Sequence, residues 1–259
     1  MEVKMDFSQF VSGIPAGDYV FQDTPYPQQI QEAAQLLLKA DAVLIGAGAG
    51  LSTAAGLAYG GRRFTENFGE FIEKYGAAYM TDMYSAGFYP FPSEEAKWGY
   101  WSKHAWLNRI EPEGVPLYRA VHEVVKDRPH FVLTTNMDHQ FWKAGFSDEV
   151  IFATQGDYGE IQCEKGCHDR AYDAVPMFRQ MNQARRDCLI PSYMVPRCPV
   201  CGGNMAMHLR CDQHFVEDSH WNEAAVPESF GGRAVGINAD IAGAVRDISE
   251  ELRKERVIR

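Results

Sequence analysis

Four cysteines in two close pairs have the spacing of a metal site. The first pair is Cys163 and Cys167, in the sequence CEKGC, and the second is Cys198 and Cys201, in CPVCGG. Thiolates three or four positions apart can point at one centre, and the glycines after Cys201 allow the turn to tighten around it. Because four sulfur ligands leave no open position, we predict a structural, tetrahedral zinc site.

Two other possibilities remain for these cysteines. They can be unrelated buried thiols, as we expect for Cys188 and Cys211, which have no close partner in the sequence. His168, directly after Cys167, can also replace one of the four sulfur ligands.

A second chemical signal lies in residues 41–57, DAVLIGAGAGLSTAAGL. The apolar run over residues 42–45 predicts a strand buried on both faces. The glycines that follow can turn sharply and let a ligand approach the backbone, and a helix beginning after Gly50 would direct free N–H groups at a pyrophosphate. The strict G-x-G-x-x-G pattern is absent, so a closely packed strand-to-helix turn is the alternative to dinucleotide binding.

A third signal follows the apolar run over residues 130–135. Asn136 and Asp138 come directly after this expected strand. Side chains at the carboxyl end of a parallel strand face the ligand crevice, where an amide and a carboxylate can bind ribose hydroxyls or a carboxamide. Capping of the next helix is the competing explanation.

The elements needed to position these residues alternate along the chain. Apolar spacing predicts helices over residues 28–40, 116–126 and 240–256, and strands over 42–45, 130–135 and 150–153. This alternation predicts an α/β fold with a Rossmann-like parallel sheet. We expect this domain over 28–62, 110–160 and 205–259, a helical aromatic insertion over 63–109, a smaller zinc-binding module over 161–204 and an N-terminal arm over 1–27.

Composition excludes some partners. The 259 residues carry 25 basic and 35 acidic side chains, a net charge of −10, without runs of lysine or arginine. We therefore expect no nucleic-acid partner and no membrane partner, and the lack of a signal-peptide pattern favours a cytoplasmic location.

Residues 48–57, GAGLSTAAGL, resemble the first signature of the sirtuins. The second sirtuin signature is similar to residues 134–145, TTNMDHQFWKAG. The resemblance implies NAD as cofactor, with Asn136 at the nicotinamide ribose and Asp138 at the nicotinamide amide. It also implies that NAD is held at Gly48, Ala49, Gly50, Ser52 and Gly56.

A third sirtuin position departs from the family pattern. Gln155, in the sequence TQGDY, stands where sirtuin deacylases carry a catalytic histidine. A carboxamide cannot take a proton from a ribose hydroxyl, although it can orient a nucleophile. Deacylation would need another base, and His139 is the local candidate.

One branch, the macrodomain-linked (class M) sirtuins, is similar in its details. The chain resembles it in AYGGRRF at 58–64, TTNMDHQF, TQGDY, and CPVCGG followed by a strand that ends in HLR at 208–210. This resemblance implies transfer of ADP-ribose from NAD to a lipoyl-carrier (glycine-cleavage H-like) protein, with a macrodomain hydrolase as functional partner. It implies catalytic roles for Asn136, Asp138, Gln155 and Arg210, and cofactor contacts from Tyr59 and Phe64.

The resemblance is interrupted between residues 221 and 232. By family length, about fifty to sixty residues of the adenosine-binding part, or about two βα units, are missing there. A zinc-stabilised binding module that does not bind NAD is therefore the third functional hypothesis.

Overall fold

The computed structural model describes residues 25–216 and 241–257. The chain divides into two compact units, one made of residues 1–44, 120–130 and 227–259, and the other of 45–119 and 131–226. Most of the predicted N-terminal arm and the whole interrupted segment 221–232 lie outside the described residues.

Two helices from opposite ends of the chain pack together in the first unit. They are α3 (Tyr26–Lys39) and α10 (Ile241–Val257), joined by the Tyr26 hydroxyl, which donates to Asp247 Oδ2 at 2.5 Å. Apolar residues at helical spacing, including Ile30 and Ala34 of α3, are buried. Both helices begin and end within two residues of the limits expected from the sequence.

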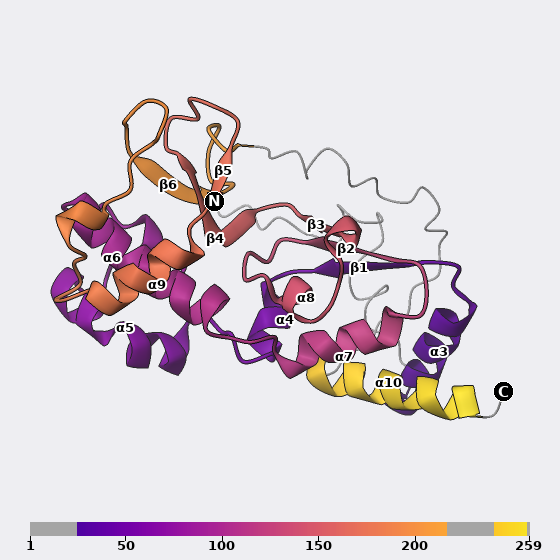
Figure 1. Ribbon diagram of the computed structural model, residues 1–259. Coiled ribbons are helices and arrows are strands. Elements are labelled where there is room, and N and C mark those ends of the chain that lie inside the picture. Colours follow the sequence, from indigo (N-terminus) through magenta and orange to yellow (C-terminus); the bar gives the residue numbers. More distant parts are fainter. Residues whose placement is uncertain (1–24, 217–240, 258–259) are drawn as a thin grey trace, which may run out of the picture. The chain divides into compact units, whose positions relative to one another are not determined.

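A three-stranded sheet has the order β1-β2-β3, and it can be followed in Figure 1. Its strands are β1 (Val43–Ala47), β2 (His130–Thr134) and β3 (Ile151–Ala153), with β2 and β3 parallel and Thr134 paired with Ala153. Helix α7 (Pro116–Val125) precedes β2, as the apolar spacing predicts. The predicted parallel α/β arrangement is confirmed.

Strand β1 is less buried than the sequence suggests. We expected burial on both faces, but its residues are half-buried and Gly46 is exposed. β1 is less buried because it lies at the edge of the sheet formed by the described strands and has only one neighbouring strand there.

Aromatic side chains form the core of the helical insertion in the second unit. Phe64, Phe68 and Phe71 recur at helical spacing on α5 (Gly61–Tyr75) and are buried. They pack with Tyr100 of α6 (Glu94–Ala105), whose ring centroid lies 4.9 Å from that of Phe68. Most of the aromatic residues of this segment therefore have a packing role.

A small antiparallel sheet with the order β5-β4-β6 completes the second unit. Its strands are β4 (Gly156–Cys163), β5 (Ala171–Asp173) and β6 (Met205–Leu209). Strand β4 starts at the residue after Gln155 and ends at the first cysteine of the predicted zinc site, so one strand connects both features. The remaining short elements are α4 (Ala49–Ala54), α8 (Gln140–Lys143), α9 (Val175–Ala184), η1 (Ser85–Phe88), the π-helical turn η2 (Trp106–Ile110), η3 (Asp148–Val150) and η4 (Ser192–Met194).

No helix among residues 25–216 and 241–257 is both long enough and apolar enough to cross a bilayer.

Candidate functional site

The glycine turn leads from β1 directly into α4. The helix begins at Ala49, earlier than expected from the sequence, and has six residues. Ala49 and Gly50 are exposed, whereas Ser52 is buried. Gly56 follows the helix with φ = 90°, a left-handed conformation that requires glycine in practice.

Residues that follow β2 meet this glycine turn. The Thr135 N–H donates to the Ala47 carbonyl oxygen at 3.0 Å, and Asn136 Nδ2 donates to the Gly48 carbonyl oxygen at 3.0 Å. A Cβ atom added at Gly48 would lie 3.4 Å from Thr135 Oγ1. The two turns that carry the second and third signals, the glycine stretch and the Asn136–Asp138 segment, therefore form one site within the second unit.

Ser52 and Asp138 lie at the centre of this site. The Ser52 hydroxyl donates to Asp138 Oδ2 at 2.5 Å, and the Gln140 N–H donates to Asp138 Oδ1 at 3.1 Å. Burial raises the pKa of Asp138, and these hydrogen bonds act against the rise because they favour the charged form. Asp138 is thus a buried carboxylate that is held from two sides.

Tyr118 of α7 completes the same network, and sequence reasoning missed it. Its hydroxyl lies 2.7 Å from Ser52 Oγ and accepts from Asn136 Nδ2 at 2.8 Å. Burial, followed by the charge of Asp138, raises the pKa of Tyr118, so the phenol stays protonated. The available signal was an aromatic residue with a polar tip on an amphipathic helix, which is weak by itself.

The main chains of Gln155 and Arg210 lie side by side. The Arg210 N–H donates to the Gln155 carbonyl oxygen at 3.0 Å, and Arg210 Nε donates to the Thr154 carbonyl oxygen at 3.0 Å. The Arg210 guanidinium also lies over the Phe215 ring, 4.4 Å from its centroid. Arg210 is an exposed residue.

Sheet register places Gln155 at the same edge as Asn136. Thr134 and Ala153 are paired in the parallel strands, and Asn136 and Gln155 each follow two residues later. Gly156, next in the chain, has φ = 96°, and a Cβ there would lie 1.9 Å from the His208 carbonyl oxygen. Only glycine fits, which fixes the turn that carries Gln155. No contact between the Gln155 side chain and Asn136 is seen among the described residues.

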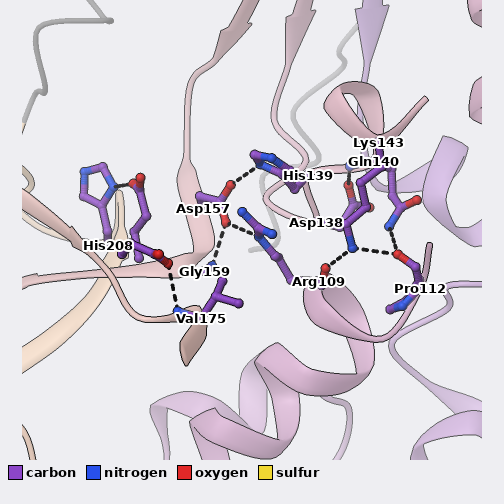
Figure 2. A network of polar contacts seen from close by, with 12 residues as sticks. Arg109, Pro112, Asp138, His139, Gln140, Lys143, Asp157, Gly159, Val175 and His208 are labelled. Atoms are coloured by element: carbon purple, nitrogen blue, oxygen red, sulfur yellow. Dashed lines mark hydrogen bonds and ion pairs between the residues drawn. The ribbon is translucent and has the colours of Figure 1, made fainter. Parts of the chain in front are cut away.

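A second polar network, shown in Figure 2, connects the Asn136–Asp138 turn with β4. Asp157 accepts from His139 Nδ1 at 2.6 Å, from Arg109 Nε at 3.0 Å and from the Gly159 N–H at 2.6 Å. Burial would raise the pKa of Asp157, but the His139 hydrogen bond and the Arg109 charge outweigh it and bring the pKa to about 2. Asp157 therefore stays ionised, and sequence reasoning did not single out Asp157 or Arg109.

The two remaining cofactor residues expected from the sequence, Tyr59 and Phe64, also belong to the second unit. Tyr59 packs its ring against Tyr158 and His104, with centroids at 6.3 Å and 5.8 Å. Phe64 is buried in the core of the helical insertion, where its ring stacks on Phe68 at 5.4 Å. Neither ring has a described hydrogen bond or ring contact with Asn136 or Asp138.

The four cysteines of the predicted zinc site converge. Their sulfur atoms all lie within 4.8 Å of one another. Cys163 Sγ is 3.8 Å from Cys201 Sγ, and Cys167 Sγ is 3.6 Å from Cys198 Sγ. Tetrahedral Zn–S bonds of about 2.3 Å place sulfur atoms about 3.8 Å apart, so this cluster fits a zinc ion.

The other two cysteines lie outside this cluster, whereas His168 lies beside it. His168 Nδ1 is 3.1 Å from Cys167 Sγ, and its Nε2 bonds to the Tyr172 hydroxyl group. Cys188 is buried as expected, but Cys211 is exposed, so that the expectation of a buried thiol was wrong there. Cys211 follows β6 in the exposed turn that begins at Arg210.

Comparison with curated proteins identifies two similar sequences. A "Protein ADP-ribosyltransferase" of Staphylococcus aureus is 37% identical over 185 residues, which cover 71% of this chain and 58% of that protein. A "Probable bifunctional ADP-ribose hydrolase/ADP-ribosyltransferase" of Fusarium oxysporum is 35% identical over 241 residues, covering 85% of this chain and 39% of that protein. The chain thus spans less than two thirds of the length of each of these relatives. No protein-family model matches it.

Comparison with solved structures concerns the fold alone. A structure described as "Structural Basis for the Mechanism and Regulation of Sir2 Enzymes" superposes with a TM-score of 0.51 at 17% identity. The match covers 88% of this chain and 98% of that one.

Proposed function

We propose that this chain, which has the Sir2 fold and is similar to proteins named ADP-ribosyltransferases, is an NAD-dependent protein mono-ADP-ribosyltransferase. One observation carries the proposal. Asn136 and Asp138 reach the glycine turn through Gly48 and Ser52, so an amide and a carboxylate stand beside a backbone with few side chains. This is the donor and acceptor set that a nicotinamide nucleotide needs.

NAD is the substrate in this proposal, and each part of the site has a distinct task. The turn at Gly48–Gly50, in which Ala49 and Gly50 are exposed, would lie against the pyrophosphate, where small residues allow close approach. Asn136 would accept a hydrogen bond from a ribose hydroxyl group, and Asp138 would accept one from the nicotinamide amide. Removal of water around the glycosidic bond favours departure of nicotinamide, so that most of the rate comes from positioning.

Gln155 favours transfer to protein over deacylation. Its carboxamide can orient an acceptor group by hydrogen bonding but cannot remove a proton from the ribose. Arg210, held beside it by the Gln155 carbonyl oxygen, offers a planar fork of donors that suits a phosphate or an acceptor carboxylate.

The contact between His139 and Asp157 favours a second function, deacylation. Because Asp157 is ionised and accepts from His139 Nδ1 at 2.6 Å, Nδ1 is the ring nitrogen that carries the proton of this hydrogen bond, and Nε2 is the nitrogen that can serve as a base. An imidazole held in this way can act as a general base. In that case the product would be acyl-ADP-ribose rather than modified protein.

The protein acceptor and the functional partner follow from the same proposal. We infer a lipoyl-carrier (glycine-cleavage H-like) protein as the acceptor, on the basis of the class M motifs alone. A macrodomain hydrolase would reverse the modification. The name of the Fusarium relative, which joins a hydrolase and a transferase, supports this pairing.

Zinc would have a structural role here. Cys163, Cys167, Cys198 and Cys201 would hold the ion with four sulfur ligands, which leave no position for a substrate. When bound, the ion would hold the end of β4 at Cys163, and β4 begins at Gly156, directly after Gln155.

The test combines binding and transfer. Isothermal titration of the full chain with NAD should give measurable heat, and label from [adenylate-³²P]NAD should remain on a lipoyl-carrier protein after denaturation. Absence of any heat or thermal shift with NAD would instead support the binding module that does not bind NAD.

A further inference from the structure

Tyr118 lies outside the three sirtuin-like motifs but touches residues from two of them. It is fully buried on α7, where its ring meets Phe141 edge-on at a centroid distance of 4.8 Å. Its hydroxyl group contacts Asn136 and Ser52, and Asp138 Oδ2 lies 3.5 Å away. One phenol oxygen therefore connects the glycine turn with the Asn136–Asp138 turn.

Chemistry fixes the direction of each hydrogen bond in this network. One end of the Asn136 amide faces both the Gly48 carbonyl oxygen and the Tyr118 hydroxyl group. Because the carbonyl oxygen can only accept a hydrogen bond, this end must be the NH₂ group. The Asp138 carboxylate accepts the single Ser52 proton at 2.5 Å, and Ser52 Oγ must then accept from Tyr118. The chain of donors thus runs from Asn136 through Tyr118 and Ser52 to Asp138.

This direction determines what Asn136 offers to a ligand. Both described contacts of its side chain use Nδ2, and among the described residues no donor meets Oδ1. A hydroxyl group in the site would find an acceptor at Oδ1, whereas a flipped amide would present a donor instead. The Tyr118 hydroxyl excludes the flipped amide, because its only proton is used by Ser52.

We propose that Tyr118 is a positioning residue, whose hydroxyl group holds the Asn136 amide so that Oδ1 accepts a hydrogen bond from a ribose hydroxyl of the nicotinamide nucleotide. This inference rests on the proposed use of NAD. Tyr118 acts through Asn136 and Ser52 and does not touch the reacting atoms. The groups that hold the Asn136 amide all belong to the protein itself, and such preorganised hydrogen bonds reduce the reorganisation that a reaction requires.

The variant Tyr118→Phe removes only the hydroxyl group, and Tyr75→Phe is its matched control. The Tyr75 hydroxyl is buried in the helical insertion and has no hydrogen-bond partner among the described residues. Steady-state release of nicotinamide from NAD should show that Tyr118→Phe lowers kcat about tenfold or more while KM changes little. Tyr75→Phe should keep the kcat and KM of the wild type.

A double variant tests whether Tyr118 acts through Asn136. If it does, Tyr118→Phe together with Asn136→Ala should be no slower than Asn136→Ala alone, because effects within one network are not additive. If the rate losses of the two single variants multiply in the double variant, the proposal is overturned. A lower melting temperature of Tyr118→Phe with an unchanged kcat would also overturn it and leave Tyr118 with a packing role.

A measurement without NAD separates this inference from the proposed function. Carbon-13 NMR titration of the Asp138 carboxyl group should show a higher pKa in Tyr118→Phe than in the wild type, because the network that lowers the pKa has lost a hydrogen bond. The Asp157 charge, which also acts on Asp138, is unchanged in both proteins. If the wild type consumes no NAD, the proposed function fails, whereas an unchanged titration of Asp138 would overturn the network itself.

Discussion

Asn136 Nδ2 donates to the Gly48 carbonyl oxygen at 3.0 Å, although the two residues are 88 positions apart in the chain. This bond joins the glycine turn after β1 to the polar turn after β2. A ligand that touches one turn is therefore within reach of the other. The proposed function depends on this arrangement more than on any single side chain.

Gln155 should be required for the transfer step. Replacing Gln155 with alanine removes the carboxamide but keeps the main-chain carbonyl that accepts from Arg210. We expect transfer of label to protein to fall about ten- to a hundredfold, because an acceptor is no longer oriented, while NAD binding measured by calorimetry is retained. Gln183→Ala, at an exposed position near the end of α9, is the control. An unchanged transfer rate would remove Gln155 from the mechanism.

Arg210→Lys should show that the shape of the guanidinium matters as well as its charge. Lysine keeps the positive charge but loses the planar fork and the Nε bond to the Thr154 carbonyl oxygen. We predict a loss of about tenfold in kcat/KM for the protein acceptor with an unchanged KM for NAD. The exposed Arg246→Lys variant should behave like the wild type. Equal losses for both substrates would contradict a role at the acceptor.

Asp157→Asn should lower stability in a pH-dependent manner. Because the folded-state pKa of Asp157 is about 2, below the ordinary value of about 3.9, its ionised form stabilises the protein above pH 4. The free energy of unfolding should be about 3 kcal/mol lower in the variant at pH 7, and this difference should shrink as pH falls from about 4 towards 2.

Urea unfolding at several pH values measures this difference. The control is Asp187→Asn, since Asp187 pairs with Lys74 at the surface and its side chain is 83% exposed. Equal unfolding curves for wild type and Asp157→Asn at pH 7 would show that the Arg109–Asp157–His139 network does not contribute to stability.

The protein should contain about one zinc ion per chain, held by the four converging cysteines. Cys201→Ser should lose the metal and melt at a lower temperature, because structural zinc contributes directly to folding. Cys211→Ser changes a cysteine that is also exposed but lies outside the cluster, and this variant should keep both the zinc ion and the melting temperature of the wild type. Atomic absorption together with thermal melting gives the answer. Full zinc content in Cys201→Ser would contradict the predicted ligand set.

Regular spacing made much of the fold predictable from the sequence. Apolar periodicity located α3, α7 and α10, and short apolar runs located β1, β2 and β3. The cysteine pairs were found because metal ligands are constrained by local spacing. The prediction that β1 is buried on both faces was wrong, because burial depends on how many strands flank β1. An apolar run in the sequence does not contain that information.

The candidate site was predictable only where its residues lie in local motifs. The glycine turn and the Asn136–Asp138 turn each carry a recognisable pattern, but their contact is tertiary. Tyr118 and the pair Arg109–Asp157 were missed because each acts across long stretches of sequence, through hydrogen bonds to residues of other elements. A polar tip on a buried aromatic residue shows its partner only in the folded chain.

The most direct test follows the ADP-ribose group itself. The 259-residue chain is incubated with [adenylate-³²P]NAD, a lipoyl-carrier protein and, separately, an acylated peptide, and the fate of the label is measured. The proposed function predicts label retained on the carrier protein, stoichiometric release of nicotinamide and no acyl-ADP-ribose. Label recovered only as acyl-ADP-ribose, with none on protein, would contradict it.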